Sequence, residues 1–596
     1  MTFKNINLGP TSFRKNNKEI YGFDVETCNK NKTFLCATLY SDNPNFTKTF
    51  YNKRDCIEYF KLKRFKSSII ATTNLGFDFN ALFFNEPEAM EFLPCWRGSH
   101  LIFEKSHIGD KKFYLKNEKK TRRTITFLDT LNYASLKVEE LGKILNIPKL
   151  KTPSFIGERP NNNKEWNELI TYNIRDAEIS MKFIKFIYGV FHKLGATPQL
   201  TIASSAMSLW KNRFLDKTYT RHFINQLMDE FKAYYGGRCE VFKRGEIRNY
   251  KYYDYNSLYP SCMIKEYPEP NTLKVKYGSS LEFIESYEGI SKVDMECPNM
   301  YIPLLPYRTD DKLLFPVGNF SGWYSHLELR KALTLGYIIK KVHTSYYFLK
   351  TCFPFRDYVK ELYRERKYYQ SAGSSVEKII KLLMNGLYGK FGQKFINRDR
   401  WIPMPETIEE FNELIKKYPD VEEINEYLRI KQKFTEPKPF CVPIWALYTT
   451  AYARLKLFSL LNKSSPAYCD TDSIITKHSL DTSLRLGDLK LEDRIKYGIL
   501  IKPKFYGFRN DKGEEKVRIK GLSSDMSIEN LRNFSINPTM TFNKFCKFKE
   551  GLRRGFIPNE IIDVTKTFSL EDNKRVWPEM FSMENLQDSE ALKIGI

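Results

Sequence analysis

The chain of 596 residues is long enough for several domains, each with its own buried core. Its 95 Lys and Arg residues outnumber 71 Asp and Glu residues, and the net charge of +24 suits a polyanionic partner, although a soluble basic protein can have the same balance without one. The 11 cysteines include no Cys-x-x-Cys pair, and no uncharged apolar run approaches membrane-spanning length, which argues against a zinc site, a disulfide framework and a membrane protein.

A first set of carboxylates lies in the N-terminal third of the chain. A predicted strand carries Asp24 and Glu26 on one face. Downstream segments add Asp78 and Asp176, and Tyr172 lies one helical turn before Asp176 on the same helix face. Each piece alone also fits a solvated acidic surface, whereas their order and spacing favour a functional site. The segments are Tyr21-Gly22-Phe23-Asp24-Val25-Glu26-Thr27, Asn74-Leu75-Gly76-Phe77-Asp78 and Tyr172-Asn173-Ile174-Arg175-Asp176.

The middle of the chain begins with Tyr234-Tyr235-Gly236-Gly237-Arg238. Paired glycines let a backbone approach another segment closely, although an ordinary turn also favours them. Residues 252–261 predict an aromatic strand that ends at Asp254, followed by a turn closed by Pro260. Residues 267–353 have strand-like and helical patterns of their own and separate this strand from the next motif.

Residues 381–390 predict a helix on which Lys381, Asn385 and Tyr388 occupy one face, at i, i+4 and i+7. A cation, an amide and an aromatic ring on one stripe can meet a triphosphate, a sugar and a base in that order. A second long and highly charged segment follows at about 397–439, and segments of this length are usually functional or disordered. A further helix is predicted from Pro443 onward.

Tyr468-Cys469-Asp470-Thr471-Asp472-Ser473 is the most informative stretch. Asp470 and Asp472, two residues apart on a short apolar strand, are expected to project to one side, where like charges repel unless a cation lies between them. Mg²⁺ suits this arrangement because it needs few protein carboxylates and leaves room for substrate phosphates. An ordinary polar turn has the same composition. Later, Lys504-Phe505-Tyr506 follows, and 559–570 alternates like a strand pair.

Three of these segments resemble, in the right order, motifs A, B and C of family B DNA polymerases. They are Asp254 with Ser257-Leu258-Tyr259-Pro260, Lys381 with Asn385-Gly386-Leu387-Tyr388-Gly389, and Tyr468-Cys469-Asp470-Thr471-Asp472-Ser473; Gly386 replaces the usual Ser. The resemblance implies that Asp254 and Asp472 ligate two Mg²⁺ ions, for which Mn²⁺ can substitute, with Asp470 in support. It also implies that Lys381 and Asn385 bind the nucleotide, that Tyr259 excludes a 2′-OH and that Tyr388 packs against the nascent base pair.

The N-terminal acids resemble the Exo motifs of DnaQ-type 3′–5′ exonucleases, which have an RNase H-like fold. This resemblance implies that Asp24, Glu26, Asp78 and Asp176 hold two metals and that Tyr172 positions the attacking water. Further DNA-binding residues implied by it are Asn74, Phe77, Thr130, Leu131 and Lys151, and Lys149 competes with Lys151 for the lysine position.

The connecting segments resemble those of protein-primed polymerases of small linear-genome phages. Tyr234 with Gly236 and Gly237 is similar to a linker that contacts template, and Lys504 with Tyr506 is similar to a motif that holds the primer terminus. The two long segments fall where those enzymes have terminal-protein regions 1 and 2. The implied partners are template and primer DNA, dNTPs and a terminal protein, with no membrane and a monomer or a heterodimer with the priming protein.

We therefore expect an α/β (α+β) multidomain enzyme in the cytoplasm, or in the host cytoplasm if the chain is viral. The expected units are an exonuclease domain at 1–200, palm at 201–266 and 440–535, insertions at 267–353 and 397–439, fingers at 354–396, and a thumb with a C-terminal extension at 536–596. Strand-displacement synthesis is implied as well. The alternatives are a conventionally primed family B polymerase and a non-catalytic nucleic-acid-binding scaffold.

Overall fold

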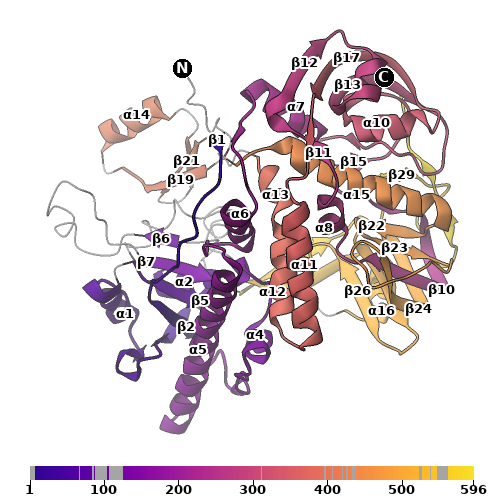
Figure 1. Cartoon of the computed structure of the whole chain (residues 1–596). Helices are drawn as coiled ribbons and strands as arrows, with labels where there is room; N and C mark the ends of the chain where they lie inside the picture. Colours follow the sequence, from indigo (N-terminus) through magenta and orange to yellow (C-terminus); the bar gives the residue numbers. More distant parts are fainter. Residues whose placement is uncertain are drawn as a thin grey trace.

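The computed structural model is built around three sheets (Figure 1). The N-terminal sheet lies at the lower left of the view, a second sheet at the lower right, and a third near the C-terminus. The structure describes residues 7–65, 67–83, 86, 104–106, 125–310, 312–394, 398–405, 407–418, 421–424, 427–432, 438, 440–522, 526–536, 538–545 and 561–595.

The N-terminal sheet is mixed, in the order β4-β3-β2-β5-β7-β6, with β2, β5 and β7 parallel. Its strands are β2 (Ile20–Cys28), β3 (Thr33–Tyr40), β4 (Lys48–Phe50), β5 (Ile69–Thr72), β6 (Glu104–Ser106) and β7 (Ile125–Asp129), and its helices are α1 (Lys53–Phe60), α2 (Leu75–Phe83), α4 (Val138–Leu145) and α5 (Asn163–Leu194). Helix α5 lies against β2 at Gly22, where a Cβ atom would come within 1.9 Å of the Ala177 carbonyl oxygen. Only glycine therefore lets α5 approach β2 this closely.

The second sheet is antiparallel, in the order β26-β25-β24-β10-β23-β22-β9, and β30 adds to β10. Its strands are β9 (Cys239–Val241), β10 (Lys243–Tyr255), β22 (Tyr468–Asp470), β23 (Ser473–Thr476), β24 (Leu489–Lys502), β25 (Phe505–Asn510), β26 (Glu515–Ile519) and β30 (Gln587–Asp588). The predicted helix after Pro443 is α15 (Pro443–Ser464). Pro260 closes no turn; it lies in the first turn of α8 (Leu258–Met263), where a helix needs no N–H donor.

Two antiparallel helices, α11 (Arg356–Ser371) and α12 (Val376–Gly386), stand between the two larger sheets in Figure 1. The helix predicted over 381–390 is divided, because α12 ends at Gly386 and the short α13 covers Tyr388–Phe391. On the other side, α6 (Ile202–Arg213) and α7 (Ile224–Ala233) connect the N-terminal sheet to the second sheet, and β1 (Asn7–Leu8) pairs with β8 (Tyr219–Thr220).

The third sheet belongs to the segment between β11 (Tyr267–Pro268) and β18 (Thr351–Cys352), which pair with each other and so bring the two ends of this segment together. Its order is β12-β17-β13-β16-β32. The strands are β12 (Leu273–Tyr277), β13 (Glu288–Cys297), β16 (Val317–Ser325), β17 (Ile338–Phe348) and β32 (Lys593–Ile594), and α9 (Leu281–Ser286) and α10 (His326–Leu333) accompany them.

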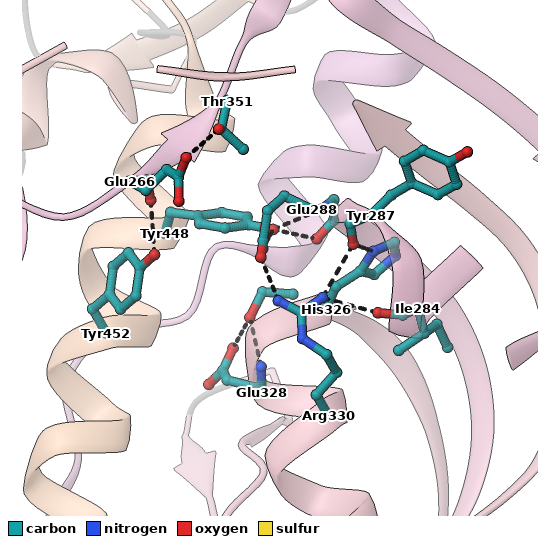
Figure 2. Close-up of polar contacts among 12 residues, drawn as sticks. Glu266, Ile284, Tyr287, Glu288, His326, Glu328, Arg330, Thr351, Tyr448 and Tyr452 are labelled. Carbon is teal, nitrogen blue, oxygen red and sulfur yellow. Dashed lines mark hydrogen bonds and ion pairs between the residues drawn. The ribbon is translucent and has the colours of Figure 1, made fainter. Parts of the chain in front are cut away.

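A polar network holds the third sheet against α15 (Figure 2). The hydroxyl of Tyr448 in α15 donates to Glu288 Oε2 at 2.8 Å and accepts from the Gly289 N–H at 2.6 Å. Arg330 holds the other oxygen of Glu288 and donates to the Tyr287 carbonyl at 3.1 Å. His326 is fully buried, and its Nδ1 lies 2.7 Å from the same Tyr287 carbonyl. Because His326 and Tyr448 are buried and Glu288 and Arg330 are half-buried, the interface depends on satisfied hydrogen bonds.

The last part of the chain joins the second and third sheets. The buried Arg244 of β10 donates to Gln587 Oε1 at 2.6 Å, and Arg575 donates to the Tyr301 carbonyl at 2.9 Å. Strand β32 extends the third sheet by pairing in parallel with β16.

Smaller elements complete the described parts of the chain. The segment after α13 contains β19 (Arg398–Pro403), α14 (Ile408–Lys417), β20 (Val421–Ile424) and β21 (Tyr427–Gln432). Near the end, α16 (Ile528–Ile536) precedes the hairpin of β27 (Thr539–Phe545) and β28 (Ile561–Thr567). The strand pair predicted within 559–570 is therefore one strand, whose partner comes earlier. Among the described helices, none is long and apolar enough to cross a membrane.

Candidate active sites

Two carboxylates of the second sheet lie side by side. Strand β10 places Asp254 opposite Ser473 of β23, and the Tyr255 N–H donates to the Asp472 carbonyl at 2.8 Å. Burial and the negative charge of Asp254 raise the pKa of Asp472 to about 6. Burial also raises the pKa of Asp254, against the lowering effect of the nearby Lys490 and Lys381. Because ionisation of both carboxyl groups is unfavourable here, a bound cation would stabilise their charged forms.

These two carboxylates open into a cavity of about 260 Å³ that also contains the predicted nucleotide-binding residues. Lys381 and Asn385 line it from α12, although the helix ends just after them. Tyr259 and Tyr388 line it as a stacked pair, with ring centroids 4.6 Å apart. The structure thus brings together side chains from β10, α8, α12 and α13 that are far apart in the sequence.

Asp470 departs from the prediction that it shares one side of a strand with Asp472. Strand β22 ends at Asp470 and β23 begins at Ser473, so Thr471 and Asp472 form the turn of a hairpin. Asp470 therefore lines a different cavity, of about 820 Å³, with Lys504 and Tyr506. Its Oδ2 accepts a hydrogen bond from Lys504 Nζ at 2.7 Å. The turn, with a φ of 61° at Thr471, is the physical reason for the separation.

Two cations of the smaller cavity were absent from the predicted set. Lys490 Nζ lies 3.4 Å from Asp254 Oδ2, because the register of β24 places Lys490 opposite Asp254. Arg366 of α11 lines the same cavity, donates to Ser257 Oγ at 3.2 Å and pairs with Glu377. Strand register and helix packing position these two residues, and no local motif marks them.

The Tyr234–Gly237 segment (residues 234–237) packs directly against the turn at Thr471. A Cβ atom on Gly237 would lie 2.8 Å from Thr471 Cγ2, and the Thr471 N–H donates to the Arg238 carbonyl at 2.7 Å. Arg454 of α15 donates to the carbonyls of Tyr235 at 2.7 Å and Gly236 at 3.0 Å. The paired glycines thus allow close contact with the carboxylate-bearing turn.

The N-terminal carboxylates gather where α5 crosses β2. Asn173 of α5 donates to Asp24 Oδ2 at 2.6 Å, and the Val25 N–H donates to Asp78 Oδ1 at 3.1 Å. Burial and then the neighbouring carboxylates raise the pKa of Asp24 well above its ordinary value, and burial followed by Asp176 raises that of Glu26 to about 7. Oδ1 of Asp176 is buried without a hydrogen-bond partner, so this site has an oxygen available for a cation.

Of the two candidate lysines, Lys149 reaches the carboxylates. Its ammonium forms an ion pair with Asp176 Oδ2 and lies 4.4 Å from the ring centroid of Tyr172. Lys151, the residue chosen from the sequence, is exposed. The Lys149 side chain therefore contacts α5 through Asp176.

The remaining predicted residues lie around this site. Asn74 is exposed and has a φ of 67°, and its N–H donates to Asp129 Oδ1 at 3.2 Å. Phe77 is half-buried in α2, and Leu131 is half-buried just after β7. Thr130 is buried and donates to Thr73 Oγ1 at 3.0 Å, which holds it within the fold.

Metal binding fits the donor atoms at both sites, although in the described part of the chain no group of three or more Asp, Glu, His or Cys side chains is arranged so that it could hold a metal ion. Mg²⁺ commonly takes only one or two protein carboxylates and completes its shell with water and phosphate. Asp254 and Asp472 provide two such ligands in the cavity of the second sheet.

Comparisons with known proteins agree with this geometry. A probable DNA polymerase of Ascobolus immersus is 28% identical over 601 residues, which cover 87% of this chain and 48% of the relative. The DNA-directed DNA polymerase of Enterobacteria phage PRD1 is 27% identical over 330 residues, which cover 54% of this chain and 55% of the relative. The chain thus spans about half the length of the curated relatives it matches.

The fold matches that of Phi29 DNA polymerase complexed with primer-template DNA and incoming nucleotide substrates. The TM-score is 0.69 at 17% identity, and the match covers 93% of this chain and 100% of that one. The family model for DNA polymerase type B, organellar and viral, matches residues 10–475. The chain therefore belongs to the organellar and viral family of type B DNA polymerases.

Proposed function

We propose that this protein is a DNA-directed DNA polymerase that adds dNMP to a primer 3′-OH and releases pyrophosphate. The observation that carries the proposal is the single cavity that combines Asp254 and Asp472 with Lys381, Asn385 and the Tyr259–Tyr388 pair (residues 259 and 388). In this cavity a triphosphate can lie between the carboxylates and the cations of the helices, with its base and sugar on the tyrosines.

Each side chain has a role that its position supports. Asp254 and Asp472 would hold Mg²⁺, or Mn²⁺ in its place; when bound, the metals activate the 3′-OH and stabilise the leaving pyrophosphate. Lys381 and Arg366 line the cavity and would neutralise triphosphate charge, which stabilises the transition state. Tyr259 lies where bulk excludes a 2′-OH, and Asn385 supplies a hydrogen-bonding amide. Asp470 and Tyr506 act with Lys504 on the primer strand in the neighbouring cavity.

The N-terminal site is proposed to be a 3′–5′ exonuclease centre. Asp24, Glu26, Asp78 and Asp176 would hold the metals, and Tyr172 would orient the attacking water. We assign the lysine role to Lys149, because its ammonium lies at both Asp176 and Tyr172. Asn74, Phe77, Thr130 and Leu131 are proposed to surround the single-stranded end, with Lys151 at most on the rim.

We propose the same domain limits that the sequence predicts. The exonuclease domain would cover residues 1–200, the palm 201–266 and 440–535, the fingers 354–396, and the thumb and extension 536–596. The first insertion, at 267–353, is supported by the pairing of its two ends through β11 and β18. The described parts of the second insertion, at 397–439, form a small antiparallel sheet with one helix.

Initiation by a terminal protein is the further part of the proposal. A protein primer needs a docking surface beyond the DNA channel, and the first insertion contacts the loop at 234–238. Arg308 of this insertion donates to the Tyr234 carbonyl and lies 4.9 Å from the Tyr235 ring centroid, so it connects the insertion to this loop. Replication of a linear genome with strand displacement would follow from such initiation.

A primer-extension assay tests the polymerase proposal. The protein, Mg²⁺ and four dNTPs should extend a labelled primer on a DNA template, and Asp254→Asn should abolish extension while the variant still degrades single-stranded DNA. Absence of extension by the folded wild-type protein would favour the non-catalytic scaffold. Protein priming is tested separately, by formation of a covalent protein–dNMP adduct without a nucleic-acid primer; extension without any adduct would favour conventional priming.

A further inference from the structure

Two adjoining cavities lie along the N-terminal segment before β2. One has a volume of about 1060 Å³ and the other about 540 Å³, and Arg14 and Thr197 line both. Figure 1 shows this indigo segment passing from β1 beside α6 to β2. No residue assigned above to the polymerase or exonuclease centre lines either cavity. Together they form one groove, which we call the N-terminal groove.

The charge of the N-terminal groove is strongly positive. Among its described lining residues only Glu19 is acidic, whereas the basic ones are Arg14, Lys15, Lys18, Arg64, Lys211 and Lys390. This ratio is far above the 95 basic to 71 acidic residues of the whole chain. Most other lining residues are Ser, Thr, Asn or Gln, which together with Arg and Lys are the usual partners of phosphate oxygens.

The groove is built into the fold. The Thr11 N–H donates to the Lys211 carbonyl at 3.1 Å, and Thr11 Oγ1 donates to Asn212 Oδ1 at 2.7 Å, so the segment is fastened along α6. The Arg14 N–H donates to Thr197 Oγ1 at 2.9 Å, whereas the exposed guanidinium of Arg14 has no hydrogen bond or ion pair with the described residues. Its charge is therefore available to a ligand.

Arg64 provides a preorganised cation at the other end of the groove. Its guanidinium carbon lies 3.6 Å from the ring centroid of Phe46, and Nη1 donates to the Tyr59 hydroxyl at 3.2 Å. Arg64 lines the larger of the two cavities. A guanidinium held on an aromatic ring loses little entropy when it binds an anion.

The groove starts close to the proposed nucleotide site. Lys390, in its lining, follows Tyr388 by two residues on α13. We propose that the N-terminal groove binds single-stranded DNA through its phosphodiester backbone. The inference rests on the proposed function in one respect: a DNA polymerase makes DNA the expected polyanion. Two single strands have this chemistry. One is the unpaired template ahead of the nucleotide site, and the other is the non-template strand displaced from a downstream duplex.

Binding without dNTPs tests the groove independently of catalysis. Fluorescence anisotropy of the full-length protein is measured with primer–templates that have 5′ template overhangs of increasing length, and with a nicked duplex whose downstream strand has a 5′ flap. The variants are Arg14→Glu and Arg64→Gln. The matched control is Lys164→Glu, one charge reversal at an exposed lysine at the start of α5, outside this groove.

Arg14→Glu should weaken binding of a long single-stranded extension about tenfold near 0.1 M salt, and should lower the slope of log K against log salt by roughly 0.7. Arg64→Gln should have a smaller effect in the same direction, and Lys164→Glu none. Loss confined to the 5′ overhang identifies the template, and loss confined to the flap identifies the displaced strand. Equal affinities and slopes for all proteins on all DNAs would overturn the inference. A wild-type protein that binds but never extends would instead contradict the proposed function.

Discussion

Gly237→Ala should reduce nucleotide incorporation because the added Cβ atom would crowd the turn at Thr471. The added Cβ would lie 2.8 Å from Thr471 Cγ2 and 3.0 Å from Oγ1, whereas ordinary contact begins at 3.4 Å. Thr471 Cβ would also lie only 3.2 Å away, so rotation of the Thr471 side chain does not remove the crowding and the hairpin turn between Asp470 and Asp472 must shift. A shift of about 0.6 Å in Asp472 is expected to cost about tenfold in kcat/KM, or about 1.4 kcal/mol, since about 1 Å of misplacement can cost roughly a hundredfold.

The assay is single-nucleotide incorporation on a primer–template with Mg²⁺, with degradation of single-stranded DNA as an internal control. Thr471→Gly removes both clashing atoms, and it also removes the hydrogen bond from Thr471 Oγ1 to Asp470 Oδ1. The single variant Thr471→Gly is therefore measured as well, so that a double-mutant cycle separates the loss of this hydrogen bond from the relief of the clash. If adding Thr471→Gly to Gly237→Ala restores none of the lost incorporation, or if Gly237→Ala is fully active, the proposed contact does not position the turn.

Further outcomes are expected elsewhere in the chain. Asp472→Asn should abolish dNMP incorporation in a primer-extension assay and spare exonuclease activity, and Asp24→Ala should do the reverse; joint loss of both activities in a folded protein would contradict two separate sites. Tyr259→Val should weaken discrimination against ribonucleotides by about 1–3 kcal/mol, measured as the ratio of kcat/KM values, whereas an equal loss for both substrates would mark Tyr259 as a packing residue. Burial lowers the pKa of His326 to about 4. Between about pH 6.5 and 4 the unfolded chain therefore binds a proton that the folded protein does not. The free energy of unfolding should decrease by up to about 3 kcal/mol as the pH is lowered through this range. The fall in Tm across this range should be smaller in His326→Gln; an identical fall would assign the effect to other groups.

The resemblance of local motifs to a known family predicted the α/β multidomain class and family B membership, and the comparisons confirm both. Asp254 and Lys381 could be found from the sequence because each lies in a compact motif. The motif of Asp254 has the two-residue period of a strand, and the motif of Lys381 has the 3.6-residue period of a helix. Their meeting in one cavity depends on contacts across more than a hundred residues, which local periodicity does not contain. The resemblance to a known family supplied that part of the prediction.

The features of the two sites that the local patterns did not contain share a physical cause. The separation of Asp470 from Asp472 arises because the chain reverses between them, and a two-residue turn has the same composition as a strand end. Lys490 became a neighbour of Asp254 through strand register alone. The Lys149 side chain contacts Asp176 of α5, whereas the Lys151 side chain is exposed. In each case tertiary packing decides between local alternatives that the sequence leaves equal.

The pairing of β32 with β16 has a consequence for biosynthesis. Roughly 270 residues separate Ser325 from Lys593, so the ribosome needs on the order of ten seconds to a minute to deliver the closing strand. During that interval Val317 and Gly318 of β16 lack the partner that β32 later supplies, and an unpaired strand edge is a template for pairing with another chain. The nascent protein is therefore more exposed to aggregation through this edge until Lys593 and Ile594 have been made, and slow synthesis of the segment that precedes them should lower the soluble yield.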